Sequence, residues 1–183
     1  RVRGIEGDAA TYYFGVFPHL ILNQKESFVF KGRNRRPPKD AVNAMLSFVY
    51  TLISNDVTAA LETVGLDPYV GFMHALRPGR PSLALDIMEE LRAYLGDRLV
   101  LSLINRKQIT GNQFLQQGDE SIIMTDDARR TIISAWQARK KEQIQHPFLN
   151  EKVSIGLLPH IQAMMLARYL RNDLDDYPVF LIQ

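Results

Sequence analysis

Apolar side chains recur at three- and four-residue steps along most of this chain, a spacing that is typical of amphipathic α-helices. It predicts helices over residues 2–22, 42–53, 56–64, 82–106, 125–145 and 154–171. The residues at the predicted helix ends agree with these ranges. Pro37, Pro38 and Asp40 precede the second helix, and Ser82 and Thr125 are N-cap candidates for later ones.

Two shorter stretches have the composition of extended chain. Residues 27–31, SFVFK, form a short apolar run, and residues 113–125 resemble a hairpin that turns at Gly118 and Asp119. Residues 65–82 are rich in glycine and proline, so we expect an irregular loop there. The sequence therefore predicts a single, mainly α-helical domain over residues 1–183 with one or two short β hairpins or strands.

The composition narrows the possible chemistry. A chain of 183 residues with 46% hydrophobic and 23% charged residues can bury a full core. It contains no cysteine, which excludes disulfides, thiolate zinc sites, iron–sulfur clusters and a cysteine nucleophile. Any metal must therefore have oxygen and nitrogen ligands, which hard or borderline divalent ions accept.

The chain shows no sign of membrane insertion or export. No stretch approaches the roughly 18 consecutive apolar residues of a transmembrane helix, and no charged-then-apolar leader follows Arg1. We therefore expect a cytoplasmic protein that does not contact a membrane. Because the first residue is not methionine, we also expect the chain to begin inside a larger protein.

The formal net charge of +2 conceals a local excess of basic residues. Residues 31–39, KGRNRRPPK, contain five cations and no acid, namely Lys31, Arg33, Arg35, Arg36 and Lys39. Such a run is either a solvated loop or a surface that neutralises phosphates.

His74 is the histidine with the most suggestive surroundings. It lies in the loop 65–82, directly before a predicted helix whose early turns carry Asp86, Glu89 and Glu90. Carboxylates three and four residues apart lie close together on a helix, and with an imidazole they form a ligand set suited to Mn²⁺ or Mg²⁺. Apolar residues flank Asp86, so its charge needs a cation, which could equally be Arg77, Arg80 or Arg92.

Four strings of residues carry a resemblance to a known family. They are GIEG in residues 4–7, GRNRRPPKD in 32–40, GLDPYVGFMH in 65–74 and GRPSLALDIMEE in 79–90. In this order and combination the chain resembles the CRISPR-associated integrase of spacer acquisition, and most closely the branch associated with type I-C systems. It departs from the family pattern at Ala41, where proline is usual, and at Asn172, where glycine is usual.

The resemblance implies a protein with an N-terminal β-rich domain and a C-terminal helical catalytic domain, of which this chain is the second alone. It implies that Glu6, His74 and Glu89 are the catalytic ligands of Mn²⁺ or Mg²⁺, with Asp86 at the neighbouring acidic position. It also implies strand transfer, in which a 3′-hydroxyl of new spacer DNA attacks a phosphodiester of the CRISPR repeat.

Further expectations concern DNA contacts and the helices beside them. We expect DNA contacts from Lys31, Arg33, Arg35 and Arg36 in the basic run and from Arg77 and Arg80 beside His74. Asn43 is a candidate to support the metal ligands or to bind phosphate, and its alternative role is to cap a helix. For the last helix, with Gln162, Arg168 and Arg171, we expect a packing role.

The implied partners are double-stranded DNA, a second copy in a homodimer of the full-length protein, and a small ferredoxin-like adaptation protein. An alternative from a different class is a non-catalytic module that binds DNA or assembles the adaptation complex. A third possibility is an unrelated, metal-independent hydrolase that uses Asp86 and Glu90 as acid and base.

Overall fold

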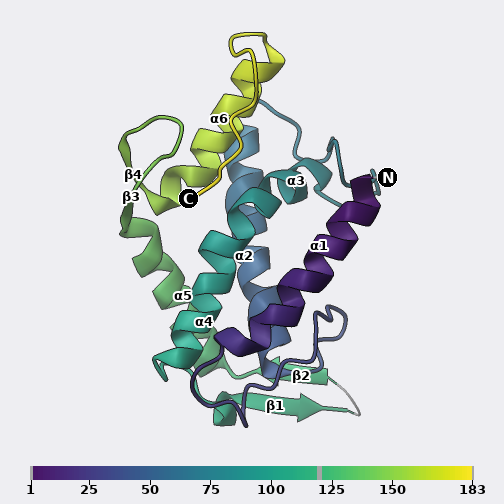
Figure 1. Ribbon diagram of the computed structural model, residues 1–183, viewed down its shortest axis with the longest axis vertical. Helices are drawn as coiled ribbons and strands as arrows, with labels where there is room; N and C mark the ends of the chain where they lie inside the picture. Colours follow the sequence, from purple (N-terminus) through teal and green to yellow (C-terminus); the bar gives the residue numbers. More distant parts are fainter. Residues whose placement is uncertain (1, 119–120, 183) are drawn as a thin grey trace. The chain divides into compact units, whose positions relative to one another are not determined.

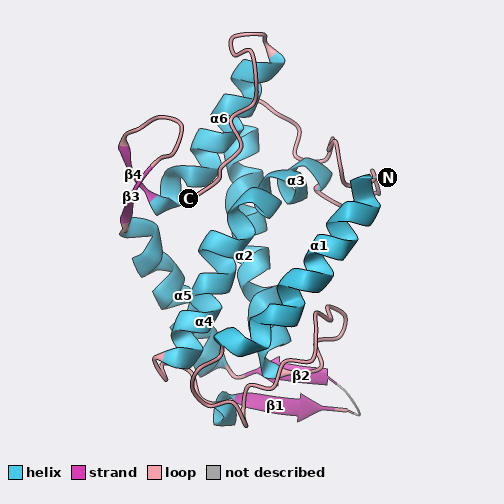
Figure 2. Cartoon of the chain, viewed as in Figure 1, coloured by secondary structure: helices cyan, strands magenta, loops and turns pink. Residues whose placement is uncertain are grey.

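The computed structural model describes residues 2–118 and 121–182, and they are mainly helical, as predicted (Figures 1 and 2). The chain divides into two compact units, Arg1–Val49 with Arg98–Ser134, and Tyr50–Asp97 with Ala135–Gln183. The expectation of a single domain stays a prediction.

The first unit contains α1 (Val2–Val16), the 3₁₀ turn η1 (Phe17–Leu20), the whole of α4 (Arg98–Asn105) and the start of α2 (Ala41–Thr63). Pro18 follows the end of α1, where its ring and missing N–H favour termination. The rings of Phe14, Phe17 and Phe30 pack together in the core, with centroids 5.1 to 6.0 Å apart.

The predicted hairpin also belongs to this unit. It consists of β1 (Phe114–Gln117) and β2 (Ser121–Met124), which pair antiparallel with Phe114 opposite Met124. Gly118 has a φ of +64°, the left-handed conformation that favours glycine in a tight turn. Asp119, the other predicted turn residue, lies outside the described residues.

The second unit contains α3 (Ser82–Leu91), the π-helical turn η2 (Arg92–Asp97), the 3₁₀ turn η4 (Ile155–Leu157) and α6 (Leu158–Leu170). It also contains the second part of α2 and the end of α5 (Asp126–Lys141). A second antiparallel pair, β3 (Gln143–Gln145) and β4 (Lys152–Ser154), lies between α5 and α6 (Figure 2). The core side chains come mainly from α2, α3 and α6, and include Ile53, Val57, Leu61, Leu83, Ile87, Leu91, Leu158 and Ile161.

Two local predictions were wrong. Residues 42–64 do not form two helices, because α2 runs without a break from Ala41 to Thr63 and its buried stripe continues past Ser54 through Val57 and Leu61. Ser82 is not the N-cap of α3. It is the first helical residue, and its hydroxyl instead donates to the backbone oxygen of Ala75, 3.1 Å away.

Other helix ends were correct or close. The carboxylate of Asp40 accepts a hydrogen bond from the backbone N–H of Asn43 at 2.7 Å and caps α2. At the start of α5, the hydroxyl oxygen of Thr125 accepts a hydrogen bond from the backbone N–H of Ala128. The helix α5 (Asp126–Lys141) ends four residues earlier than predicted, since residues 143–145 form β3. Residues 82–106 are helical almost throughout, although the π-helical turn interrupts them.

The helix α2 is, among the described helices, the one that is long and apolar enough to cross a membrane. Its most apolar window of 18 residues has a mean hydropathy of 1.3, and half of that window is buried inside the structure. Core helices of globular proteins show the same combination, so the expectation of no membrane contact stays a prediction.

Candidate functional site

The loop that contains His74 is fixed to α3 by one carboxylate. Asp86 accepts the backbone N–H groups of Phe72, Met73 and His74 at 2.6, 3.0 and 3.0 Å. Gly71 lies so close that an added Cβ would be 2.7 Å from Asp86 Oδ2. The glycine is therefore needed for the close approach, and the loop backbone is rigidly held although the chain there has no regular secondary structure.

The same carboxylate orients the imidazole of His74. Asp86 Oδ1 lies 2.6 Å from His74 Nδ1, and the two side chains are only 9% and 17% exposed. Burial alone would raise the pKa of Asp86. The N–H of Met73, the ring of His74 and the N–H groups of Phe72 and His74 together outweigh burial and lower that pKa below its ordinary value.

The ionised carboxylate of Asp86 determines which ring nitrogen of His74 donates a hydrogen bond to it. Because the carboxylate can only accept, His74 Nδ1 carries a proton and donates to it, and Nε2 is the ring nitrogen that remains for a ligand. A histidine whose second ring nitrogen donates to a carboxylate is the usual arrangement of a metal-bound histidine. The arginine partners considered for Asp86 are not used, since His74 and the loop amides take that place.

Glu89 lies three residues after Asp86 on α3 and is partly exposed. Its carboxylate oxygens lie 2.6 and 2.9 Å from Arg92 Nη1 on the same helix, and its side chain is 29% exposed. This contact with a guanidinium orients the carboxylate. Sequence reasoning did not foresee the pairing with Arg92, although the spacing of three residues on a helix is a signal for it.

The proposed ligands fall into different units. His74 and Glu89 belong to the second unit, whereas Glu6 is an exposed residue of α1 in the first. Among the described residues of the second unit, no group of three or more histidine, aspartate and glutamate side chains is placed to hold a metal ion. The convergence of Glu6 with His74 and Glu89 stays a prediction.

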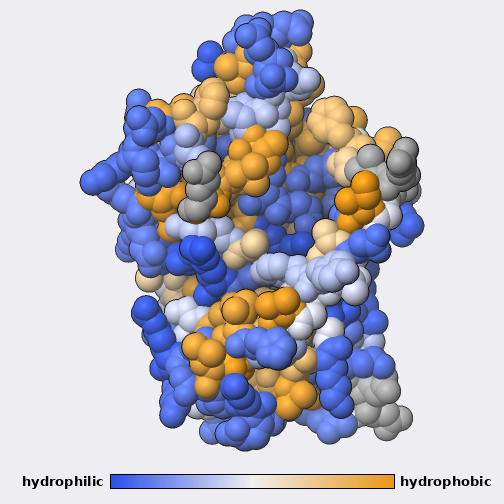
Figure 3. Space-filling model, in the orientation of Figure 1, coloured by the Kyte–Doolittle hydropathy of each residue, from blue (hydrophilic) through white to orange (hydrophobic). Residues whose placement is uncertain are grey.

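The loop around His74 combines cations with exposed apolar side chains. Arg77 is exposed and Arg80 is half-buried, and no acid occurs between Asp67 and Asp86. Phe72 and Leu76 are 67% and 65% exposed. Orange apolar patches also interrupt the hydrophilic surface on the face shown in Figure 3. The loop is thus a positively charged and partly apolar surface with a firmly held backbone.

The basic run 31–39 has an anchor of its own, Asn43 in the first turn of α2. Its amide oxygen accepts from Arg33 Nη1 and from the N–H of Asn34 at 2.7 and 3.0 Å. Its amide nitrogen donates to the oxygen of Gly32 and to Asp40 Oδ2 at 2.9 and 2.6 Å. Asn43 is fully buried, and three of the four hydrogen bonds of its side chain hold the loop, while the fourth goes to Asp40.

The cations of the basic run differ in their surroundings. Arg33 is half-buried and also donates to the hydroxyl of Ser47, so part of its guanidinium supports the loop. The remaining cations are exposed, namely Lys31, Arg35, Arg36 and Lys39.

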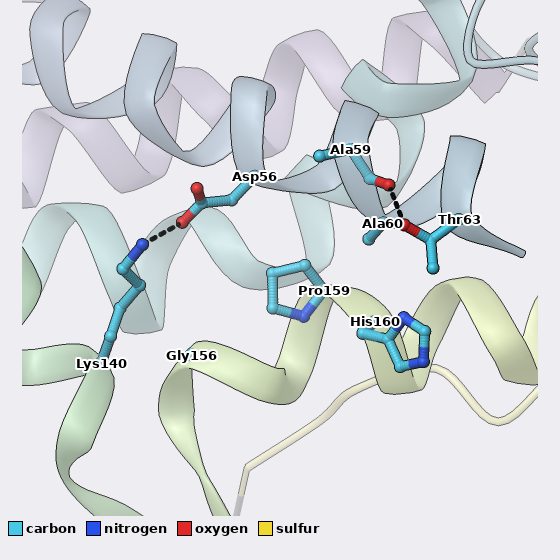
Figure 4. A pocket seen from close by; sticks show the side chains of 8 residues that line it. All are labelled: Asp56, Ala59, Ala60, Thr63, Lys140, Gly156, Pro159 and His160. Atoms are coloured by element: carbon cyan, nitrogen blue, oxygen red, sulfur yellow. Dashed lines mark hydrogen bonds and ion pairs between the residues drawn. The ribbon is translucent and has the colours of Figure 1, made fainter.

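A separate, shallow pocket in the second unit has a volume of ≈ 240 Å³ and is lined by α2, α5 and the start of α6 (Figure 4). Lys140 and Asp56, which form an ion pair of 3.0 Å, are among the residues that line it, and so is His160. None of the predicted site residues line this pocket.

The third candidate, a hydrolase that pairs Asp86 with Glu90, has little support from the geometry. Asp86 contacts the loop 72–74, whereas both oxygens of Glu90 accept from Gln162, Tyr177 and the backbone N–H of Phe180. The two carboxylates therefore share none of these partners.

Comparisons with known proteins agree with the motifs. The family described as "CRISPR associated protein Cas1" matches residues 1–138. The chain is 58% identical over 179 residues to a CRISPR-associated endonuclease Cas1 of Chlorobaculum tepidum, covering 98% of this chain and 52% of that protein. It is 52% identical over 180 residues to the Cas1 endonuclease of Leptospira interrogans, covering 98% and 70%.

Solved structures show the same fold. A Cas1 protein from Thermotoga maritima matches with a TM-score of 0.81 and 31% identity, over 92% of this chain and 51% of that one. A casposase bound to its integration product matches with a TM-score of 0.86 and 25% identity, over 100% of this chain and 52% of that one. The chain spans about half the length of the first curated relatives it matches.

Proposed function

Because the chain belongs to the Cas1 family of CRISPR-associated proteins, we propose that it carries the metal-dependent endonuclease and integrase site of spacer acquisition, in a type I-C-like branch of that family. The reaction joins the 3′-hydroxyl of new spacer DNA to a phosphodiester of the CRISPR repeat. The observation that carries this proposal is the His74–Asp86 pair, in which a loop held by hydrogen bonds presents the Nε2 atom of an oriented imidazole.

The donor set fits a hard or borderline divalent cation. His74 Nε2 and the carboxylates of Glu89 and Glu6 would hold Mn²⁺ or Mg²⁺, since they supply one nitrogen and the oxygen donors that these ions prefer. The bound ion would polarise a phosphoryl oxygen and stabilise the charge that develops there. Asp86 keeps the imidazole in the correct tautomer, and Arg92 fixes the direction of Glu89.

Two basic surfaces would bind the DNA. Arg77 and Arg80 flank His74 and would hold the phosphates near the reacting one, while Lys31, Arg35 and Arg36 would contact the backbone further along. The network of Asn43 and Arg33 would keep the second surface in shape.

We also propose the partners that relatives display. A related structure holds an integration product, and another is a complex of Cas6-RT-Cas1 with Cas2. By analogy the full-length protein would act in the cytoplasm as a homodimer with a small ferredoxin-like partner on double-stranded DNA.

The experiment is a strand-transfer assay with a labelled DNA end and a plasmid that carries the repeat, run with Mn²⁺, with Mg²⁺ and with EDTA. We expect His74→Ala to lower joining by at least about 100-fold, because the loss of a metal ligand exceeds the 10- to 100-fold cost of losing a supporting group. His160→Ala is the matched control, since this half-buried histidine lines the shallow pocket and no proposed ligand does. Equal activity of the two variants would contradict the proposal.

A second candidate, a non-catalytic module that binds DNA or assembles the adaptation complex, is favoured by the ordered and exposed basic run 31–39. Calorimetry with Mn²⁺ separates the two candidates. Binding that is lost in Glu6→Ala and in His74→Ala supports the catalytic site. Salt-dependent DNA binding without any Mn²⁺ binding supports the module.

A further inference from the structure

The C-terminal segment of the second unit is tied to α3 by the half-buried carboxylate of Glu90. Glu90 Oε1 accepts the hydroxyl of Tyr177 at 2.8 Å, and Glu90 Oε2 accepts the backbone N–H of Phe180 at 2.9 Å. Glu90 is the residue after Glu89 and lies one helical turn beyond Asp86. The chain therefore returns from beyond α6 to the helix that carries the proposed site.

Gln162 of α6 completes the attachment from a third element. Its Nε2 lies 2.9 Å from Glu90 Oε2, 2.9 Å from the hydroxyl of Tyr177 and 3.1 Å from the backbone oxygen of Pro178. The side chain is fully buried, which agrees with the packing role predicted for it. Its polar atoms, however, join α3 to the C-terminal segment.

His146 orients this amide. The backbone N–H groups of Phe148 and Leu149 donate to His146 Nδ1 at 3.3 and 3.2 Å, so this nitrogen is unprotonated and Nε2 carries the hydrogen. Nε2 lies 3.3 Å from Gln162 Oε1 and donates to it. The amide nitrogen of Gln162 is thereby directed at Glu90.

An apolar contact secures the same segment. Phe180 is 2% exposed, and its ring packs against those of Tyr94 and His146 with centroids 6.0 and 5.7 Å apart. Burial raises the pKa of Glu90, and the N–H of Phe180, the hydroxyl of Tyr177 and the amide of Gln162 offset this only in part. A half-buried carboxylate that accepts from three donors is held firmly in its position.

We propose that residues 177–180 form a strap that, through Glu90 and Gln162, fixes the position of α3 and so the hold of Asp86 on the loop 72–74. The strap consists of positioning residues, and it touches neither DNA nor metal. Its use in catalysis rests on the proposed function, whereas its effect on the loop does not.

The direct readout is amide hydrogen exchange of residues 72–74, whose N–H groups donate to Asp86. Tyr177→Phe removes the hydroxyl bond to Glu90 and keeps the ring. We expect exchange in the loop to be about tenfold faster, which corresponds to the loss of about one hydrogen bond to a charged group. Tyr169→Phe is the matched control, because this partly exposed tyrosine of α6 lies outside the network.

The second readout is Mn²⁺ affinity by calorimetry, for which we expect about tenfold weaker binding in Tyr177→Phe and none of this change in Tyr169→Phe. A shorter chain that ends at residue 176 removes the whole strap and should show both effects more strongly. Far-UV circular dichroism, measured at the temperature of each experiment, shows whether the variants are folded.

The possible outcomes separate this proposal from the proposed function. Tyr177→Phe with a lower melting temperature but unchanged loop exchange would overturn the strap, because the segment would then contribute only to global stability. If the unmodified protein binds no Mn²⁺, the metal site is refuted, and loop exchange alone decides the strap. Faster loop exchange with unchanged Mn²⁺ affinity would refute its use in catalysis.

Discussion

Two loops of this protein, 31–39 before α2 and 65–81 before α3, are held in the same way, by anchoring side chains of different charge. In each, one side chain from an early turn of the following helix holds the loop backbone. Asn43 does this in the first unit and Asp86 in the second. Both loops are therefore ordered without strands or helices of their own.

The difference lies in what each anchor presents. Asn43 is neutral, binds the guanidinium of Arg33 and leaves the neighbouring cations exposed, which suits a surface for phosphates. Asp86 is an anion that orients an imidazole, which suits a centre for a cation. The amide and the carboxylate thus differ in the side chain that each one orients, a guanidinium in the first loop and an imidazole in the second.

Removing the carboxylate should have the largest effect. Asp86→Ala leaves three loop N–H groups and His74 without their acceptor, so we expect the free energy of unfolding to fall by about 3 kcal/mol, measured by urea denaturation. Glu62→Ala removes an exposed acid of α2 and should change it by less than about 0.5 kcal/mol. Similar values for both variants would mean that Asp86 does not hold the loop.

Removing the amide should have the next largest effect. Asn43→Ala breaks four neutral or charge-assisted hydrogen bonds at a loop that is partly exposed to water, and we expect a loss of about 2 kcal/mol. DNA binding should weaken as well, because the cations of the basic run lose their fixed positions. The matched control is Asn55→Ala on the exposed side of the same helix. If both variants lowered the free energy of unfolding equally, the role of Asn43 as the anchor of this loop would be refuted.

Lowering the pH should distinguish Asp86 from Asn43. Of the three predicted effects on the free energy of unfolding, we expect this one to be the smallest. The folded-state pKa of Asp86 is lowered, so the unfolded state binds this proton more tightly and the stabilisation by the carboxylate is present above its ordinary pKa. It should be lost as the pH falls through the lowered folded-state pKa. The unfolding free energies of the unmodified protein and of Asp86→Asn should therefore converge in acid, and a constant difference would contradict this. The amide of Asn43 has no proton to gain in that range.

Local patterns predicted much of the fold. The 3.6-residue spacing of apolar positions predicted α1, α5 and α6 to within a few residues at most ends, and Gly118 indicated the first hairpin. The split of α2 was wrong because Ser54 and Asn55 are weak helix formers that the buried stripe on either side overrides. The hairpin β3–β4 was missed because its strands are only three residues long.

The candidate site was predicted in part. Apolar neighbours around Asp86 indicated a charge in need of a partner, and the structure identifies His74 and the loop amides as that partner. The apolar neighbours of Glu90 carried the same signal. Its partners could not be predicted, because Gln162 and Tyr177 lie 72 and 87 residues further along the chain.

The sequence by itself determined the helical class, the absence of cysteine ligands for any metal and the membership of the Cas1 family, because these depend on residue type and on order along the chain. The tertiary structure alone decided which polar side chains hold which loops. A hydrogen bond between a helix and a distant segment depends on distances of about 3 Å, and only the packed core sets these distances.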